Sequence, residues 1–173
     1  TREKLVYISM GTVNNNMTNL YKNCIEAFIN SDYQVVLSVG SQVDINELEE
    51  YVIKSDSRAQ FHLLSYVDQI AVLEKADVFL THCGMNSVSE SLYFKVPLVM
   101  YPQTNEQKGV AFRVNELGAG IYLNSESISD IQMAAKELLQ QSKYKEQANV
   151  ISNSFSKCGG SKAAVEKILD VCS

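Results

Sequence analysis

Short apolar runs rich in β-branched residues alternate along this chain with amphipathic segments. Such alternation is typical of repeated β-α units around a mostly parallel sheet. The runs are short and largely apolar, as strands covered on both faces are. The sequence therefore predicts an α/β fold with a six-stranded sheet, whose strands fall at about residues 4–10, 33–39, 59–64, 77–81, 97–101 and 120–123.

Helical patterns fill the connections between these strands and continue after the last one. The chain of 173 residues fits one domain, and we expect its final helix at about 161–172, after the Gly159-Gly160 break. The expected helices are 18–30, 45–54, 69–75, 87–94, 107–117, 127–141, 143–156 and 161–171.

Charge and composition exclude several classes of function. The formal net charge is −5, with 15 Lys and Arg against 20 Asp and Glu, so no positive field is expected to bind nucleic acid. No apolar run approaches the roughly 20 residues of a membrane span. The four cysteines are far apart and form no C-x-x-C pair, which favours reduced thiols in a cytoplasmic protein and no metal site. Because the chain does not begin with Met, we expect it to be part of a longer protein.

The segment after the fourth predicted strand, THCGMNSVSE at 81–90, carries the strongest functional signal. The first turn of a helix presents unpaired N–H groups and the positive end of the helix dipole, which together favour an anion such as phosphate. Gly84 allows close approach of the backbone, while His82, Asn86 and Ser87 add side-chain donors. The alternative is that Asn86 or Ser87 caps the helix and that His82 is an ordinary, partly buried histidine. The position favours a ligand, since open α/β sheets bind ligands beyond the carboxyl ends of their strands.

Three other segments follow strands at the same edge of the predicted sheet. PQTNEQ at 102–107 places a carboxylate beside amides, which suits the vicinal hydroxyls of a sugar; the alternative is a helix start capped by Thr104 or Asn105. SMGT at 9–12 could bring a hydroxyl and a closely approaching backbone to the same crevice, and Tyr66 offers an aromatic face for a base. G-x-G-x-x-G and P-loop patterns are absent, which argues against dehydrogenases and kinases.

The H-x-G-x-N-S-x-x-E pattern followed by P-Q-x-x-E-Q resembles the donor-binding signature of the UDP-glycosyltransferases, especially the macrolide-glycosyltransferase branch. YISMGT, HLLSYVDQIAVLEKADVFLTH and GGSKAAVEKIL are similar to other parts of the same family, so the resemblance spans nearly the whole chain. It implies the Rossmann-like carboxyl-terminal domain of the two-domain type B glycosyltransferase fold, here residues 1–173.

The resemblance also implies a role for each matching residue. His82, Gly84, Asn86 and Ser87 would hold the diphosphate, with Gly11 and Thr12 closing over it. Glu90 would accept from the ribose hydroxyls, Val67 would meet the uracil through its backbone, and Tyr66 would stack on it. Glu106 and Gln107 would take the sugar hydroxyls, and Gln69 and Asn105 would also belong to the donor site. Tyr66 and Asp68 depart from the family's usual Trp-Val-Pro-Gln, so a smaller ring would stack on the base, which leaves uracil the expected base.

The implied activity is inverting transfer of a hexose, with UDP-glucose as the expected donor, to a hydroxyl of a small molecule without a metal. No catalytic residue is expected in this chain, because the general base would lie in an amino-terminal acceptor-binding domain, so the isolated domain would be inactive. The sequence leaves open a donor-binding subunit of a split glycosyltransferase, a UDP-sugar epimerase, an interaction domain without a ligand, and self-association of the isolated domain.

Overall fold

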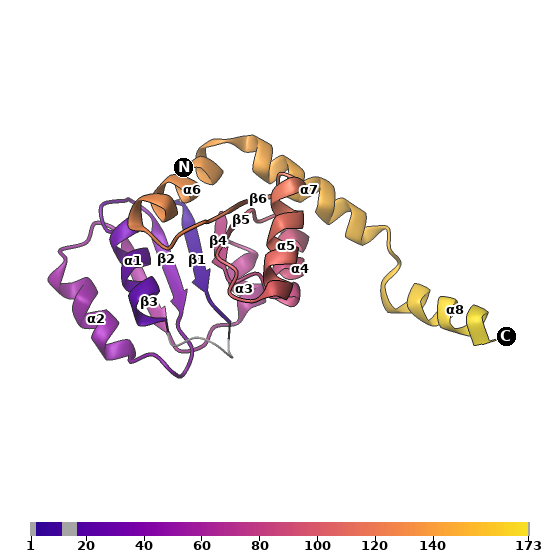
Figure 1. Cartoon of the computed structure of the whole chain (residues 1–173), viewed down its shortest axis with the longest axis horizontal. Helices are drawn as coiled ribbons and strands as arrows, with labels where there is room; N and C mark the ends of the chain where they lie inside the picture. Colours follow the sequence, from indigo (N-terminus) through magenta and orange to yellow (C-terminus); the bar gives the residue numbers. More distant parts are fainter. Residues whose placement is uncertain (1–2, 12–16, 173) are drawn as a thin grey trace.

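The computed structural model describes residues 3–11 and 17–172, which form alternating strands and helices followed by a helical tail (Figure 1). Six strands form one sheet in the order β3-β2-β1-β4-β5-β6, and all five pairings are parallel. The strands are β1 (Leu5–Ser9), β2 (Gln34–Ser38), β3 (Gln60–Leu64), β4 (Val78–Thr81), β5 (Leu98–Met100) and β6 (Gly120–Tyr122).

Eight helices accompany the sheet within the described residues. They are α1 (Thr18–Phe28), α2 (Ile45–Lys54), α3 (Gln69–Leu73), α4 (Met85–Tyr93), α5 (Asn105–Glu116), α6 (Ile128–Gln140), α7 (Ser142–Ser156) and α8 (Gly160–Cys172). The predicted α/β class, the six strands and the eight helices are confirmed, with ends that differ by at most two residues.

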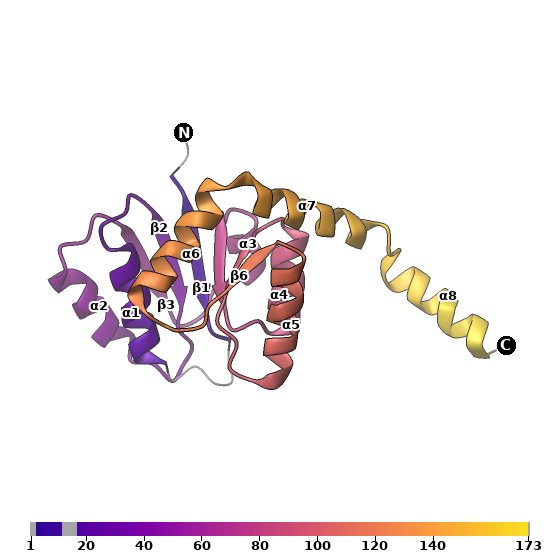
Figure 2. The same ribbon diagram turned by 45° about the horizontal axis from the view of Figure 1, so that its top comes forward.

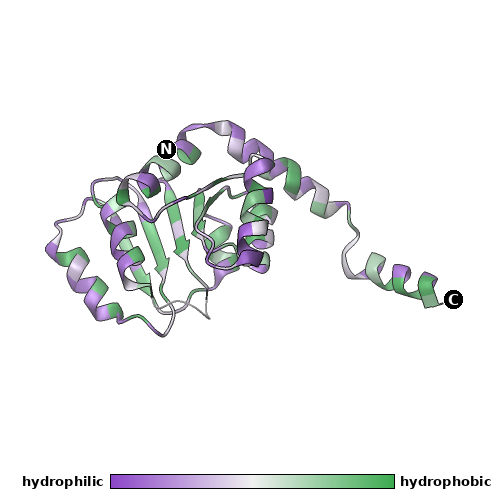
Figure 3. Cartoon of the chain, in the orientation of Figure 1, coloured by the Kyte–Doolittle hydropathy of each residue, from purple (hydrophilic) through white to green (hydrophobic). Residues whose placement is uncertain are grey.

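Helices cover both faces of the sheet because successive side chains of a strand point to opposite faces. In β1, Val6 and Ile8 join a core with side chains of α1, α2 and α6, while Leu5 and Tyr7 join a second core with side chains of α3, α4, α5 and α7. Figures 1 and 2 show these two helical layers on either side of the strands. The buried strands are mostly apolar, as Figure 3 shows by colour.

The chain order reverses in the sheet between β1 and β4, because β1 is followed by β2 on one side while β4 begins the other half. At such a point the connections leave the strand ends in opposite directions and open a crevice at the carboxyl edge. Ser9 of β1 pairs with Thr81 of β4 at this edge. The predicted functional segments therefore meet at the place where the topology opens the sheet.

The last helix, α8, extends away from the rest of the molecule (Figures 1 and 2). No side chain of α8 is buried anywhere in residues 160–172. Its apolar side chains Val165, Ile168, Leu169 and Val171 are each more than half exposed. Among the described residues, no helix combines the length and apolar character needed to cross a bilayer.

Candidate functional site

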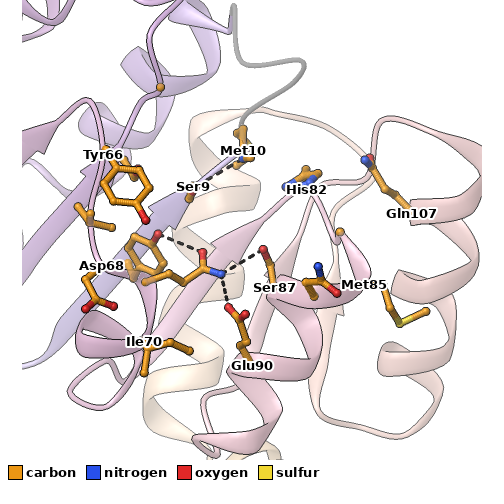
Figure 4. A pocket seen from close by; sticks show the side chains of 18 of the residues that line it. Ser9, Met10, Tyr66, Asp68, Ile70, His82, Met85, Ser87, Glu90 and Gln107 are labelled. Carbon is orange, nitrogen blue, oxygen red and sulfur yellow. Dashed lines mark hydrogen bonds between the residues drawn. The ribbon is translucent and has the colours of Figure 1, made fainter.

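A cleft of about 730 Å³ lies at the carboxyl edge of the sheet, where β1 and β4 end. Figure 4 shows side chains from the strand ends and from the starts of the following helices around it. The cleft gathers most of the residues singled out in the sequence, namely Gly11, Tyr66, Val67, Gln69, His82, Gly84, Asn86, Ser87, Glu90, Glu106 and Gln107.

The connection from β4 to α4 turns sharply at Cys83. This buried residue has a φ of 68°, in the left-handed region that few residues other than glycine adopt. Its backbone N–H donates to Thr81 Oγ1 at 3.3 Å, which holds the turn from within β4. A strained, well-supported turn of this kind places His82 and the start of α4 on the same side of the cleft.

The imidazole of His82 lies between two glycines. An added Cβ would lie 2.6 Å from His82 Cε1 at Gly11 and 2.8 Å from His82 Nε2 at Gly84. Gly11 also has a φ of 81°, which disfavours any side chain there. Both glycines are therefore required for the ring to occupy its position.

His82 is neutral at physiological pH in this environment. Burial lowers its pKa, and only an interaction with the backbone at Ser9 works in the opposite direction. Its Nδ1 is buried and has no hydrogen-bond partner among the described residues. The ring thus has hydrogen-bonding capacity that the protein itself leaves unused.

Helix α4 begins at Met85, and its N-cap residue, Gly84, has no side chain to cap it. Helices α1 and α7 also begin without a side-chain cap, whereas α2, α3, α5 and α6 are each capped by a side chain, from Asp44, Asp68, Thr104 and Ser127. The alternative that Asn86 or Ser87 caps this helix is wrong, because the helix already begins at Met85. The start of α4 lines the cleft, and the N–H groups of a first helical turn, which have no partner within the helix, suit an anion.

A hydrogen-bond network joins α3 to α4 across the cleft floor. Gln69 Nε2 donates to Glu90 Oε2 at 2.6 Å and to Ser87 Oγ at 3.3 Å. The Tyr7 hydroxyl, from β1, donates to Gln69 Oε1 at 3.2 Å. The dashed lines in Figure 4 trace these bonds to Ser87 and Glu90. The carboxylate of Glu90 is thereby held toward the cleft.

The segment before α3 forms one wall of the cleft (Figure 4). The Tyr66 ring is 78% exposed, while Val67 is buried. Asp68 caps α3 by accepting from the N–H of Ala71 at 3.2 Å. Asp68, one of the two departures from the family pattern, therefore has a structural role at this helix start.

The opposite wall is the start of α5, where Thr104 and Gln107 form a capping box. Gln107 Oε1 accepts from the N–H groups of Gln103, at 2.8 Å, and Thr104, at 3.2 Å. The alternative of a capped helix start is confirmed, with Thr104 as the cap. Gln107 nevertheless lines the cleft, as does Glu106, and its amide N–H₂ is the part that remains for a ligand.

One of the predicted residues does not line the cleft, and one is not among the described residues. Asn105 is exposed at the first position of α5 and does not line it. Thr12 lies outside the described residues. The sequence analysis assigned no role to several lining residues, including Tyr7, Ser38 and Ser65. The end of the second predicted strand was the signal available for Ser38, whereas nothing in the sequence pattern marked Tyr7.

The cleft contains carboxylates but no basic side chain. Asp68, Glu90 and Glu106 line it, and no Lys or Arg does so in the described part of the protein. An anion bound there would be held by backbone N–H groups, the helix dipole and neutral donors. Within residues 3–11 and 17–172, no three His, Cys, Asp or Glu side chains are grouped as a metal site requires.

Comparison with known proteins finds relatives that are named as glycosyltransferases. The profile of the family described as UDP-glucoronosyl and UDP-glucosyl transferase matches residues 2–156. In Bacillus subtilis, the uncharacterized UDP-glucosyltransferase YojK is 37% identical over 170 residues, which cover 97% of this chain and 40% of YojK. The NDP-glycosyltransferase YjiC of the same organism is 39% identical over 166 residues, covering 95% of this chain and 41% of YjiC.

A solved structure extends the comparison to three dimensions. The crystal structure of the kitacinnamycin glycotransferase superposes with a TM-score of 0.87 at 31% identity, over 97% of this chain and 43% of that protein. The chain thus spans about two fifths of the length of the proteins that it matches.

Proposed function

The chain belongs to the UDP-glucoronosyl and UDP-glucosyl transferase family, and on this premise we propose that residues 1–173 are the donor-binding domain of a UDP-dependent glycosyltransferase. The observation that carries the proposal is the uncapped start of α4 beside His82, at the point where the strand order reverses. The N–H groups, the helix dipole and the neutral imidazole favour a diphosphate there. The name of YojK as a UDP-glucosyltransferase supports a UDP-sugar as the ligand.

The diphosphate binds at the start of α4 in this proposal. Gly84 lets the backbone approach it closely, and Asn86 and Ser87 add side-chain donors. Gly11 is required beside His82, and together with Thr12 it would close over the phosphates. As UDP leaves, charge develops on the diphosphate, and fixed donors stabilise this charge without any reorganisation.

The ribose and base extend toward α3. Glu90, held by Gln69, has its other carboxylate oxygen available for the ribose hydroxyls. The exposed ring of Tyr66 offers a face for stacking on the base, and the backbone of Val67 would meet the edge of a uracil.

The transferred sugar lies toward α5. Glu106 accepts hydroxyls there, and Gln107 donates through its amide N–H₂, since its carbonyl oxygen serves the capping box. Asn105, exposed beside them, would contribute at the rim. We infer a hexose, with UDP-glucose as the donor, and no metal requirement.

The reaction is inverting transfer to a hydroxyl of a small-molecule acceptor. A deprotonated acceptor oxygen attacks the anomeric carbon, the bond from this carbon to the diphosphate breaks, and UDP leaves with its electron pair. The base that takes the acceptor's proton belongs to an amino-terminal acceptor-binding domain, because His82 is committed to the phosphate. We therefore expect no activity from these residues alone.

The four cysteines form no disulfide, which supports a cytoplasmic location.

Thermal unfolding tests this function directly. A ligand that binds only the folded state raises the melting temperature, so UDP and UDP-glucose should stabilise the chain more than TDP, GDP and their sugar conjugates. His82→Ala should weaken UDP binding by roughly tenfold or more, the effect of losing a hydrogen bond to a charged group. His62→Ala, on the exposed face of β3, is the matched control. The absence of any shift with UDP, or unchanged affinity in His82→Ala, would contradict the proposal.

A further inference from the structure

Tyr7 occupies an unusual position for a core residue. Its ring is buried in β1 and stacks on Phe79 of β4, with centroids 4.5 Å apart and an interplanar angle of 13°. Its hydroxyl nevertheless reaches the cleft and donates to Gln69 Oε1 at 3.2 Å. The stacked ring fixes where this hydroxyl lies, because a buried aromatic side chain has little rotamer freedom in a packed core.

An amide side chain has two ends that differ chemically but hardly in shape. Its oxygen only accepts hydrogen bonds, whereas its nitrogen only donates. The Glu90 carboxylate, which only accepts, selects the orientation in which Nε2 faces Glu90 and Ser87, and the Tyr7 hydroxyl anchors the other end of the amide by donating to Oε1. In the opposite orientation, the amide oxygen would face the Glu90 carboxylate, and two acceptors would repel each other.

We propose that Tyr7 is a positioning residue for ribose recognition: its hydroxyl anchors the Gln69 amide, which in turn holds Glu90 for the ribose hydroxyls. This inference rests on the proposed function, in which Glu90 accepts from the ribose. Tyr7 itself contacts neither ribose nor phosphate in this scheme. Tyr7, on β1, acts through the Gln69 amide of α3 on the Glu90 carboxylate of α4.

The protonation of Tyr7 supports this role. Burial raises the pKa of the phenol to about 12. The hydroxyl therefore keeps its proton throughout the physiological range and remains a donor to Gln69. A tyrosinate could not donate to Gln69 Oε1, so the anchoring hydrogen bond would be lost.

The test uses the 173-residue chain and calorimetric affinities for UDP, 2′-deoxy-UDP and 3′-deoxy-UDP. Tyr7→Phe keeps the ring and removes only the hydroxyl. We expect it to narrow the wild-type preference for UDP over the deoxy analogues by about fivefold, the scale of one lost hydrogen bond. In a Gln69→Ala background, Tyr7→Phe should leave this preference unchanged, since the amide that it acts on is gone.

Tyr51→Phe is the control, because the Tyr51 hydroxyl also donates to a side chain, the Glu26 carboxylate at 2.6 Å, but Tyr51 lies on α2 and does not line the cleft. It should leave the preference at the wild-type value. Equal weakening of all three ligands by Tyr7→Phe would mean a structural role alone and would overturn the proposal. A wild-type chain that binds UDP without preferring it over the deoxy analogues would also overturn it, while leaving the donor site intact. Absence of UDP binding would overturn both.

Discussion

A Cβ on Gly84 would lie 2.8 Å from Nε2 of His82. Gly84→Ala therefore displaces the imidazole, although the backbone at this residue, with a φ of −58°, accommodates alanine. We expect UDP affinity to fall by about tenfold or more, because the ring no longer reaches the diphosphate. Calorimetric titration with UDP checks this outcome.

Gly109→Ala is the matched control for that substitution. A Cβ on Gly109, within α5, would meet nothing within 4 Å. Alanine should therefore keep UDP affinity and stabilise the helix by up to about 1 kcal/mol. Equal affinities of the two variants for UDP would contradict the proposed contact between His82 and the diphosphate.

The pH dependence of stability should report on His82. Its folded pKa lies below the ordinary value of 6.5 because of burial. As the pH falls through 6.5, the unfolded chain takes up a proton that the folded chain does not. The free energy of unfolding contributed by neutral His82 is thus fully present above this pH and is lost toward the lowered folded pKa.

Urea unfolding between pH 5 and 8 measures this loss. His82→Asn should flatten the dependence of the free energy of unfolding on pH relative to wild type. Saturating UDP should also reduce the slope, because the negative diphosphate favours the protonated imidazole. If the free energy of unfolding depends on pH identically in wild type and His82→Asn, another group is responsible for this dependence.

Tyr66 should determine how tightly the base is held. Its ring is 78% exposed, so substitution should change the free energy of unfolding little. Tyr66→Ala should weaken UDP binding by roughly 1–3 kcal/mol, and Tyr66→Trp should strengthen it several-fold through a larger stacking face. The same two substitutions at Tyr93, which is exposed on α4 and does not line the cleft, serve as the control. Unchanged UDP affinity in Tyr66→Ala would argue against stacking.

Gln107 combines two tasks that a single substitution can separate. Gln107→Glu keeps an acceptor oxygen for the capping box, which a Glu at this position supports, but it removes the amide donor. We expect unchanged stability and a smaller ratio of UDP-glucose to UDP affinity. Thr104→Ala should do the reverse, lowering the free energy of unfolding by about 1 kcal/mol with little change in this ratio. A normal ratio in Gln107→Glu would remove Gln107 from the sugar site.

The order of strands and helices was predictable because apolar periodicity reports burial directly. Even α2, at Ile45–Lys54, matches its predicted bounds. The starts of α4 and α5 were harder, and each helix begins two residues earlier than predicted. Thr104 and Gly84 precede these starts, and their backbone conformations, not the apolar pattern, decide where a helix begins.

The cleft was predictable where polar residues follow a strand, as His82 and Glu106 do. The contribution of Tyr7 to the cleft was not predictable, because Tyr7 occupies an inward position in an apolar strand, where a tyrosine has the pattern of any core aromatic residue. Its role depends on how far its hydroxyl reaches toward Gln69, which is 62 positions away in the sequence. Contacts of this range follow from the packing of the sheet and leave no local pattern. The exposure of α8 is likewise a property of the assembled structure, since its apolar spacing resembles that of a packed helix.

The uncapped start of α4 also affects how the helix behaves when the cleft is empty. A bound nucleotide would take the place of the N-cap residue, so the substrate would complete the secondary structure of its own binding site. The first amide protons of α4 would then exchange rapidly with solvent in the free protein and slowly in the complex. Release of UDP would in this way leave the first turn of α4 freer to fray, and binding of the next donor would stabilise it again.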